Sequence, residues 1–392
     1  MIYAPPKLDT ADLAVIELIN VQRNVLKYRI NQNPGRWTGF LRRNTFAKAM
    51  QGSNSIEGIN ANLAEAVAII DDEKPESMEE ETAKALVAYR IAMTYIMRTH
   101  DDPHFEINLQ LIRSLHYMML NYDLTKLPGQ WRPGPIFVVR EENKERVYEG
   151  PDAGRVPGLM AELAEQINSS PDGLPPMVRA ALAHLNLTMI HPFRDGNGRM
   201  ARALQTLVMA RDGILESTFC SIEEWLGRNT QAYYDVLAKV GEGSWHPEHD
   251  ALPWIRFCLV AHYQQAATLI KRSAEVGRTW DEIELLAKTH GLPDRAQAAL
   301  MDAAFGYKVR NSLYREDQEI SDVVASRDLK RLCEIGLLEP IGEKRGRFYI
   351  ASQQLRELRE SCRDRTRAAN PYQLLDSKMA VPAESQLALP GV

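Results

Sequence analysis

The chain has 392 residues, a length that suits two or three domains and can bury a sizeable core. It is 45% hydrophobic and 25% charged, as in ordinary globular proteins, and its net charge of −5 argues against a chain-wide role as a nucleic-acid-binding polycation. Its four cysteines have neither metal nor disulfide spacing, its start has no basic-then-apolar leader, and no apolar run has membrane-spanning length. These features predict a cytoplasmic protein without a membrane segment.

Residues 1–104 are predicted to form an N-terminal helical region, with loops at 31–35 and at the acidic segment 71–75. Within it, a helix around 44–58 is expected. The stretch from Ser53 to Glu57 is typical of a helix end that Gly58 closes. By itself, Glu57 is typical of a solvated surface carboxylate.

Residues 134–150 predict a β-hairpin. Short β-rich runs lie at 136–139 and 146–148, and they flank the polar segment 141–145. Taken alone, this pattern indicates an ordinary surface hairpin.

The twelve residues from His191 to Arg202 carry the strongest functional signal, with the sequence His-Pro-Phe-Arg-Asp-Gly-Asn-Gly-Arg-Met-Ala-Arg. Apolar positions spaced three and four apart predict one helix over 174–190 and a second that begins near 200 and stops at 211–213. Pro192 ends the first helix, so residues 195–198 form a loop that leads into a helix N-terminus. Free backbone N–H groups there favour anions, and glycines let phosphate oxygens approach the backbone.

The side chains of this stretch indicate phosphate chemistry. Asp195 supplies a hard oxygen that suits Mg²⁺, and Arg199 and Arg202 share the first helical turn and can hold two phosphates. His191 can take a proton near neutral pH. Each residue alone would be an ordinary structural residue, but their conjunction at this spacing favours a phosphate-handling site.

At these residues the chain resembles the Fic-domain family, whose signature His-x-Phe-x-Asp/Glu-Gly-Asn-Gly-Arg-x-x-Arg is matched at every position. The resemblance covers roughly the first two thirds of the chain. It implies a mainly α fold with a Fic core over 105–275, and transfer of AMP from ATP to a Tyr, Thr or Ser hydroxyl of target proteins or of the chain itself. The roles that it implies are a base at His191, a loop anchor at Phe193, a Mg²⁺ ligand at Asp195, a phosphate cradle at Gly196, Asn197 and Gly198, and β/γ-phosphate contacts at Arg199 and Arg202.

The same resemblance gives roles to residues outside this motif. The segment containing Ser53, Glu57 and Gly58 resembles the inhibitory signature Ser/Thr-x-x-x-Glu-Gly/Asn of relatives with an N-terminal inhibitory helix. It implies that Glu57 pairs with Arg202 and takes the guanidinium group meant for the γ-phosphate. In some relatives the same glutamate positions a water that removes AMP, so de-AMPylation is an alternative activity.

The hairpin resembles the flap that holds the target segment by strand pairing, which points to Val138, Val139 and Tyr148. Tyr233 resembles a tyrosine that lines the adenine pocket, although bulky aromatics at this spacing are more often core residues.

Residues 280–367 resemble a winged helix-turn-helix domain, with a helix over 320–332 and two β-rich runs around a basic turn within 339–350. Over 295–367, 15 Lys and Arg residues stand against 12 Asp and Glu residues, which is weakly basic for a DNA-binding surface. DNA binding, protein contacts and homodimer packing therefore all stay open for this domain. The tail over 368–392 is predicted to be disordered.

Two functions of different classes follow. The first is a regulated protein adenylyltransferase whose C-terminal domain recruits targets. The second is a DNA-binding regulator or toxin-like module that uses the Fic core as a nucleotide sensor. The intact His191 favours the enzyme, because a pure sensor needs no base there. The segment from His246 to Asp250 suggests a metal, but nothing near it in sequence completes a ligand set, so a solvated loop is expected.

Overall fold

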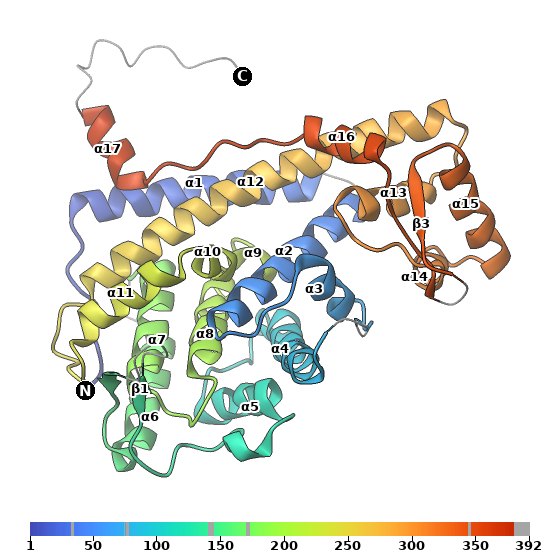
Figure 1. Cartoon of the computed structure of the whole chain (residues 1–392). Coiled ribbons are helices and arrows are strands. Elements are labelled where there is room, and N and C mark those ends of the chain that lie inside the picture. Colours follow the sequence, from blue (N-terminus) through green and yellow to red (C-terminus); the bar gives the residue numbers. More distant parts are fainter. Residues whose placement is uncertain are drawn as a thin grey trace.

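The computed structural model describes residues 1–32, 35–73, 75, 78–139, 145–169, 173–343 and 346–379 (Figure 1). Over these residues the chain is mainly helical, and its strands form two separate two-stranded antiparallel sheets. The predicted mainly α fold is therefore confirmed. Parts of several predicted loops lie outside the described residues, namely 33–34, 74, 140–144 of the flap, 344–345 of the wing, and 380–392 of the tail.

The helices of the N-terminal region are α1 Thr10–Gln32, α2 Gly35–Ile56, α3 Leu63–Ile70, α4 Glu80–Thr99 and α5 Leu109–Leu120. The middle of the chain forms η1 Leu124–Lys126, β1 Phe137–Val139, β2 Arg146–Glu149, η2 Ala153–Arg155, α6 Val156–Asn168, α7 Pro176–Ile190, α8 Asn197–Ala210, α9 Ser217–Cys220, α10 Glu223–Arg228, α11 Thr230–Gly241 and α12 Leu252–Thr289. The C-terminal part forms α13 Ala296–Ala304, α14 Asn311–Asp317, α15 Asp322–Glu334, β3 Leu338–Ile341, β4 Phe348–Ala351, α16 Gln353–Ser361 and α17 Pro371–Met379.

Helices α7 and α8 form the centre of the core, and almost all of their residues are buried. They lie side by side, and the loop that joins them contains Asp195 and Gly196 of the predicted motif. Helix α7 ends where His191 takes a left-handed backbone conformation (φ 51°, ψ 58°) and Pro192 follows. Gly196, also left-handed (φ 76°), starts α8. The sharp reversal between two buried helices holds the motif in one place.

Helix α2 crosses α10 at a contact between two glycines. A Cβ atom on Gly52 would overlap the carbonyl oxygen of Glu223, and a Cβ atom on Gly227 would lie 2.6 Å from the Cα atom of Gly52. The backbones can approach this closely only without side chains. This crossing fixes the C-terminal end of α2, which stops at Ile56 before the left-handed Gly58 (φ 76°).

The other half of α2 packs against the C-terminal part of the chain. The rings of Phe40 and Phe305 lie 4.7 Å apart, Arg43 Nη2 donates to Asp302 Oδ1 at 2.5 Å, and the Asn44 amide bonds to the Tyr307 hydroxyl. Helix α2 therefore packs against α10 near its C-terminal end and against the C-terminal part of the chain through its N-terminal half.

Helix α12 is continuous from Leu252 to Thr289, so it runs through the expected boundary between a core ending at 275 and a domain beginning at 280. Gly277, which by itself would weaken a helix, packs against the indole of Trp37 within this helix, and the division of the chain at 275–280 stays a prediction. Helix α12 lies along α1 over much of its length (Figure 1). No helix among the described residues has both the length and the apolar character needed to cross a membrane.

Beyond α12, three helices precede the β3–β4 hairpin, and Val309 forms a further β-bridge with Tyr349. This order of elements is compatible with the predicted winged helix, whose assignment stays a prediction. The chain then returns along α12 from α16 to α17 (Figure 1). The expectation of a disordered tail from 368 was wrong for Pro371–Met379, because the Tyr372 hydroxyl donates to the buried Asp12 on α1 at 2.8 Å and holds α17 there.

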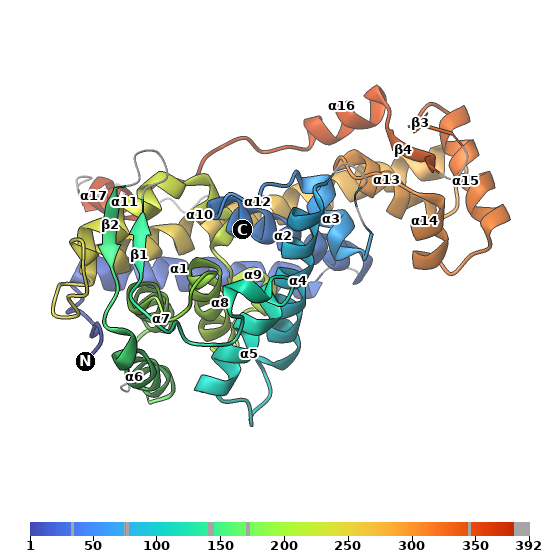
Figure 2. The ribbon, with the colours of Figure 1, turned by 60° about the horizontal axis from the view of Figure 1, so that its bottom comes forward.

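Strands β1 and β2 form the predicted hairpin, which stands beside α7 and α11 (Figure 2). Val138 pairs with Tyr148, and the register shifts between Val138 and Val139. The Tyr148 hydroxyl donates to the carbonyl oxygen of Met189 on α7 at 2.7 Å. The base of the hairpin is thus bound to the helix that ends at His191.

Candidate active site

His191 is held in the orientation that a base requires. Its Nδ1 atom lies 3.1 Å from the carbonyl oxygen of Thr188, so Nδ1 carries the proton and Nε2 keeps its lone pair. Burial, with a contribution from the nearby Arg132, lowers the pKa of His191 below its ordinary value. The imidazole is therefore neutral and ready to accept a proton at neutral pH.

A set of buried contacts fixes the loop after His191. Phe193 is fully buried, and its ring stacks on His116 at 3.6 Å with an angle of 6° between the planes. The backbone N–H of Gly129 donates to His116 Nδ1 at 2.8 Å, so His116 Nε2 carries the proton and donates to the Asp195 carbonyl oxygen at 2.9 Å. Burial lowers the pKa of His116 to about 4, which keeps it neutral in this role.

Asn197 braces the same loop from inside. Its side-chain oxygen accepts from the Phe193 N–H, and its side-chain nitrogen donates to the Phe193 carbonyl oxygen, both at 2.9 Å. Asn197 is 2% exposed and its side-chain amide is occupied by Phe193, so the phosphate role that the resemblance implied for Asn197 stays a prediction. The backbone N–H groups around Gly196 and Gly198 remain the groups suited to that role.

Asp195 has its carboxylate at the surface of the loop, with its side chain 39% exposed. Lys126, on the 3-10 turn after α5, lies 3.0 Å from Asp195 Oδ2. Partial burial of Asp195 raises the pKa of its carboxyl group, but the hydrogen bond and charge of Lys126 outweigh this and keep the pKa below its ordinary value. The carboxylate is therefore charged and exposed enough to bind a hard cation such as Mg²⁺.

Arg199 and Arg202 are both almost completely buried on the first turns of α8. The Nε and Nη1 atoms of Arg199 and the Nη1 atom of Arg202 have no hydrogen-bond partner among the described residues. Burying a guanidinium group with unpaired N–H groups destabilises the folded state unless an anion accepts hydrogen bonds from them. These donors mark the place for a polyanionic ligand.

Helix α2 reaches Arg202 through two side chains. Arg202 donates from Nε to Ser53 Oγ at 2.9 Å, from Nη2 to the Ser53 carbonyl oxygen at 2.9 Å, and from Nη2 to Glu57 Oε1 at 2.7 Å. A Cβ atom on Gly198 would overlap the Glu57 carboxylate and lie 3.0 Å from Arg202 Nη1. The Glu57 carboxylate thus occupies the space directly beside the start of α8, and Gly58 is the point at which α2 ends.

A buried polar cluster stands behind Arg202. Glu223 accepts from the Tyr89 hydroxyl and from Ser221 Oγ, and burial raises its pKa. On the other side, the Tyr233 hydroxyl lies 3.0 Å from His184 Nε2, and His184 Nδ1 lies 2.6 Å from the Gln205 side-chain oxygen. These contacts hold α8 and the ends of α10 and α11 together.

Tyr233 is 1% exposed, so its ring lies in the core. Successive positions on a helix point about 100° apart, so the adenine contact at Tyr233 stays a prediction while only one member of the Tyr233-Tyr234 pair faces outward. Tyr234 is that member: it is 44% exposed, and its hydroxyl donates to the Ile56 carbonyl oxygen at the end of α2.

The hairpin reaches the motif through Arg132. This side chain donates from Nε to the His191 carbonyl oxygen at 2.9 Å, from Nη1 to Gly134, and from Nη2 to the Pro151 carbonyl oxygen. Val139 is 41% exposed, while Val138 and Tyr148 are half-buried. An exposed strand edge beside His191 is a surface to which an extended peptide can add.

The sequence model of the Fic/DOC family matches residues 106–209, the segment that contains α5 to α8 and the loop from His191. Residues 106–209 match a Fic domain. It is 28% identical over 268 residues to the protein adenylyltransferase Fic of Aedes aegypti, which covers 67% of this chain and 46% of that protein. Against the protein adenylyltransferase Fic of Nematostella vectensis it is 27% identical over 216 residues, covering 52% of this chain and 44% of that protein. The chain therefore spans less than half the length of these relatives.

The fold is similar beyond the Fic domain itself. A Fic family protein from Desulfovibrio desulfuricans aligns with 90% of this chain and 99% of its own length, at a TM-score of 0.57 and 23% sequence identity. This likeness concerns the fold alone. It extends the structural comparison from the Fic domain to the helices and the C-terminal part on either side.

Lys126, His116, Arg132 and Glu223 were missed by the sequence reasoning as parts of the Fic site. Arg132 lies in the segment 129–132 that already resembled the approach to the flap, so its position was a usable signal. The other three lie far from the motif in sequence and carry no local pattern that would have marked them.

Proposed function

We propose that this chain is a protein adenylyltransferase that moves AMP from ATP to a Tyr, Thr or Ser hydroxyl of target proteins and of itself, and that Glu57 holds it inactive. The observation that carries the proposal is the shared position of three groups. The unpaired Nη1 of Arg202, the start of α8 and the Glu57 carboxylate meet beside Gly198, and Arg199 with two further unpaired donors is the next residue of the same helical turn. An anion site and its occupant are thus built into one place.

The phosphate chain of ATP suits the donors at this place. The N–H groups at the start of α8 and the unpaired N–H groups of Arg199 would bind phosphate oxygens. Arg202 would take the terminal phosphate once Glu57 has left. Two arginines are more than a single phosphate requires, which favours a triphosphate donor over a monophosphate ester.

The transfer follows from the state of His191. The target hydroxyl oxygen would attack the α-phosphorus while its proton passes to His191 Nε2, the nitrogen that the Thr188 contact leaves unprotonated. A new P–O bond to the target forms, and the bond from the α-phosphorus to the oxygen that bridges to the β-phosphate breaks. Pyrophosphate leaves. Catalysis then consists mainly of positioning and neutralisation of charge.

Asp195 is the residue that would hold Mg²⁺, because its carboxylate is charged and its side chain is 39% exposed. The ion would supply positive charge against the phosphate oxygens. Lys126 already neutralises Asp195 at 3.0 Å, so this lysine must shift when a cation binds. The flap would then align an extended target segment by strand pairing next to His191.

Inhibition follows from competition for Arg202. Glu57 accepts from the guanidinium group at 2.7 Å, and its negative charge stands where a terminal phosphate would bring its own. ATP would then bind only in a pose that leaves its terminal phosphate away from Arg202. Movement of the last turn of α2 would release the site.

The proposal is tested by incubation with α-labelled ATP and mass spectrometry of the modified peptides. We expect little self-modification by the intact chain, strong incorporation by Glu57→Gly, and none by Glu57→Gly combined with His191→Ala. Equal labelling of the His191→Ala protein would refute the assigned chemistry. Labelling of the intact chain at the level of Glu57→Gly would refute the inhibition, and release of free AMP from a modified target would instead support de-AMPylation.

A further inference from the structure

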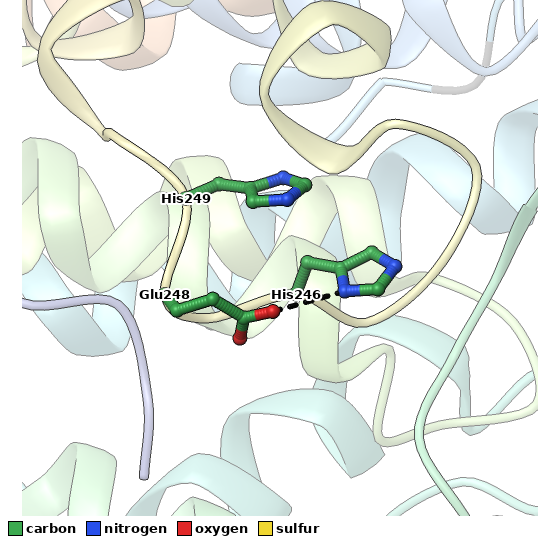
Figure 3. A group of neighbouring side chains, drawn as sticks. All are labelled: His246, Glu248 and His249. Atoms are coloured by element: carbon green, nitrogen blue, oxygen red, sulfur yellow. Dashed lines mark hydrogen bonds and ion pairs between the residues drawn. The ribbon is translucent and has the colours of Figure 1, made fainter.

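The loop between α11 and α12 gathers side chains of the kinds that ligate metals. His246, Glu248 and His249 each offer one ligand atom, and these atoms lie within 4.8 Å of one another (Figure 3). The segment from His246 to Asp250 lacks a complete ligand set in sequence, but the fold brings a further carboxylate from outside it. Glu242 Oε2 lies 4.0 Å from His249 Nε2.

Both imidazole rings are held in the way that metal-binding histidines usually are. His249 Nδ1 lies 3.2 Å from the Val240 carbonyl oxygen, so Nδ1 donates and Nε2 keeps its lone pair. His246 Nε2 lies 2.9 Å from Ser244 Oγ, and its Nδ1 lies 3.1 Å from Glu248 Oε1. For His249 this outer hydrogen bond fixes the tautomer and the direction of the ring, whereas His246 Nδ1 donates to the Glu248 carboxylate and must lose that proton when a metal binds. Each histidine therefore has one nitrogen bound outside the cluster and the other within it.

The distances allow closure around an ion. Ligand atoms about 2.0–2.2 Å from a tetrahedral Zn²⁺ lie about 3.4 Å from one another. Among His246, Glu248 and His249 the largest separation, 4.8 Å, must shrink by roughly 1.4 Å, and the 4.0 Å between Glu242 and His249 by roughly 0.6 Å, which side-chain rotation can provide. The side chain of Glu248 is 63% exposed and that of His246 is 41% exposed, so neither is restrained by packing. The two rings lie nearly parallel, at 4.8 Å and 19°, so at least one of them must turn before both nitrogens point at one ion.

We propose that His246 Nδ1, His249 Nε2, Glu248 and Glu242 form a Zn²⁺ site in this loop. Two imidazoles and two carboxylates match the nitrogen and oxygen ligands of zinc, and the two carboxylates neutralise its charge. Mg²⁺ and Ca²⁺ prefer all-oxygen sites and are not expected to compete. The site lies apart from the His191 loop and shares none of its residues.

The ion would fasten a loop that supports the flap. The backbone N–H of Glu149, the last residue of β2, donates to the Gly243 carbonyl oxygen at 2.9 Å, and Glu149 forms a β-bridge with Ser244. A Cβ atom on Gly241 would lie 3.2 Å from the Tyr148 ring. Zinc binding between Glu242 and His249 would therefore stiffen β2. An effect of zinc on target modification rests on the proposed function, whereas zinc binding itself does not.

The test is a titration of the full, untagged chain with Zn²⁺ in competition with a chromophoric chelator, after removal of metals. We expect one equivalent to bind, and the double variant His246→Ala/His249→Ala to bind at least tenfold more weakly. The matched control is His104→Ala/His290→Ala, which removes two exposed histidines elsewhere and should bind as the intact chain does. Co²⁺ should give a visible absorption band in the intact chain that the double variant lacks.

Hydrogen exchange of the amides over 145–149 provides the second measurement. Zn²⁺ should slow it in the intact chain and leave it unchanged in the double variant. The proposed site would be overturned if the intact chain and the double variant bound zinc equally well. It would also be overturned if the control His104→Ala/His290→Ala lost as much zinc affinity as the double variant. Neither measurement uses ATP. A negative result for zinc binding can therefore be told apart from a negative result for AMP transfer.

Discussion

Glu57→Gln separates the charge of the side chain that we propose to be inhibitory from its bulk. Glutamine has nearly the same shape, so it still fills the space beside Gly198, but it carries no negative charge. If inhibition is mainly electrostatic, this variant should be almost as active as Glu57→Gly. If inhibition is mainly steric, it should stay as inactive as the intact chain.

The size of the effect follows from the geometry. Glu57 Oε1 lies 2.7 Å from Arg202 Nη2, and the Arg202 side chain is fully buried. A phosphate oxygen on the same guanidinium group would lie about 4 Å from the carboxylate, where two unit charges repel by about 4 kcal/mol at an effective dielectric constant of 20. That energy corresponds to roughly a thousandfold in an equilibrium constant. Because the Glu57 side chain is 26% exposed, water screens part of this repulsion. We therefore expect the rate of AMP incorporation by Glu57→Gln to be about a hundredfold above that of the intact chain.

The assay is the initial rate of label incorporation from α-labelled ATP. Glu57→Gln and Glu57→Gly should agree within about threefold, and Glu17→Gln, which alters an exposed glutamate on α1, should match the intact chain. A Glu57→Gln protein as inactive as the intact chain beside an active Glu57→Gly protein would refute the electrostatic reasoning.

Three further predictions concern the base, the α2–α10 crossing and a buried ion pair. Burial lowers the pKa of His191 below its ordinary value of about 6.5, so the rate of Glu57→Gly should rise with pH below that value and be level from about pH 7 upward, and His191→Ala should reduce it about 10²–10⁴-fold. Gly52→Ala places a methyl group onto the Glu223 carbonyl oxygen and should lower the free energy of unfolding by about 1–3 kcal/mol, measured in urea. Arg272→Met removes the buried partner of Glu224 at 2.6 Å, leaves the carboxylate with Gln265 and the more exposed Arg228, and should cost about 3 kcal/mol at pH 7. Burial alone would raise the pKa of Glu224, but Arg272 and its neighbours hold it at about 2; the stabilisation is therefore present above the unfolded value near 4.5 and is lost as the pH falls toward 2.

Each of these predictions has a contrary outcome. A rate that still climbs between pH 7 and 9 would place the base elsewhere. The control for the crossing is Gly39→Ala, where a Cβ atom meets nothing within 4 Å, and equal stability of the two alanine variants would contradict the close contact. The control for the ion pair is Arg98→Met, at an exposed position on α4. A stability loss in Arg272→Met that grows on acidification would have the wrong sign.

Local pattern accounts for what could be predicted of the fold. The apolar spacing and the proline after His191 fix where α7 ends, and the glycine at 58 fixes where α2 ends. The mainly α fold and the hairpin follow from the same kind of signal. The pairing of Glu57 with Arg202 was predicted from the resemblance alone. No local sequence rule could predict it, because the two residues are 145 positions apart in the chain.

The remaining features depend on contacts that no local pattern contains. The continuity of α12 depends on Trp37 beside Gly277, and the order of α17 depends on a buried aspartate on α1. Lys126 meets Asp195 across 69 positions. Tyr233 and Tyr234 are chemically alike, so only the rotation of α11 against the core decides which of them is exposed. Side-chain direction within a predicted helix was therefore the least predictable property of the site.

Helix α2 connects Glu57 at its C-terminal end to packing contacts that lie outside the Fic domain. Its 22 residues span about 33 Å, and Asn44, bonded to Tyr307, lies about 20 Å from Glu57 along the helix axis. A packed helix of this length moves as one body. A ligand or partner that turned the C-terminal part of the chain would have to break the contacts at Phe40, Arg43 and Asn44 or carry the far end of the helix with them. The chain beyond α12 would then set the activity of the site without touching it.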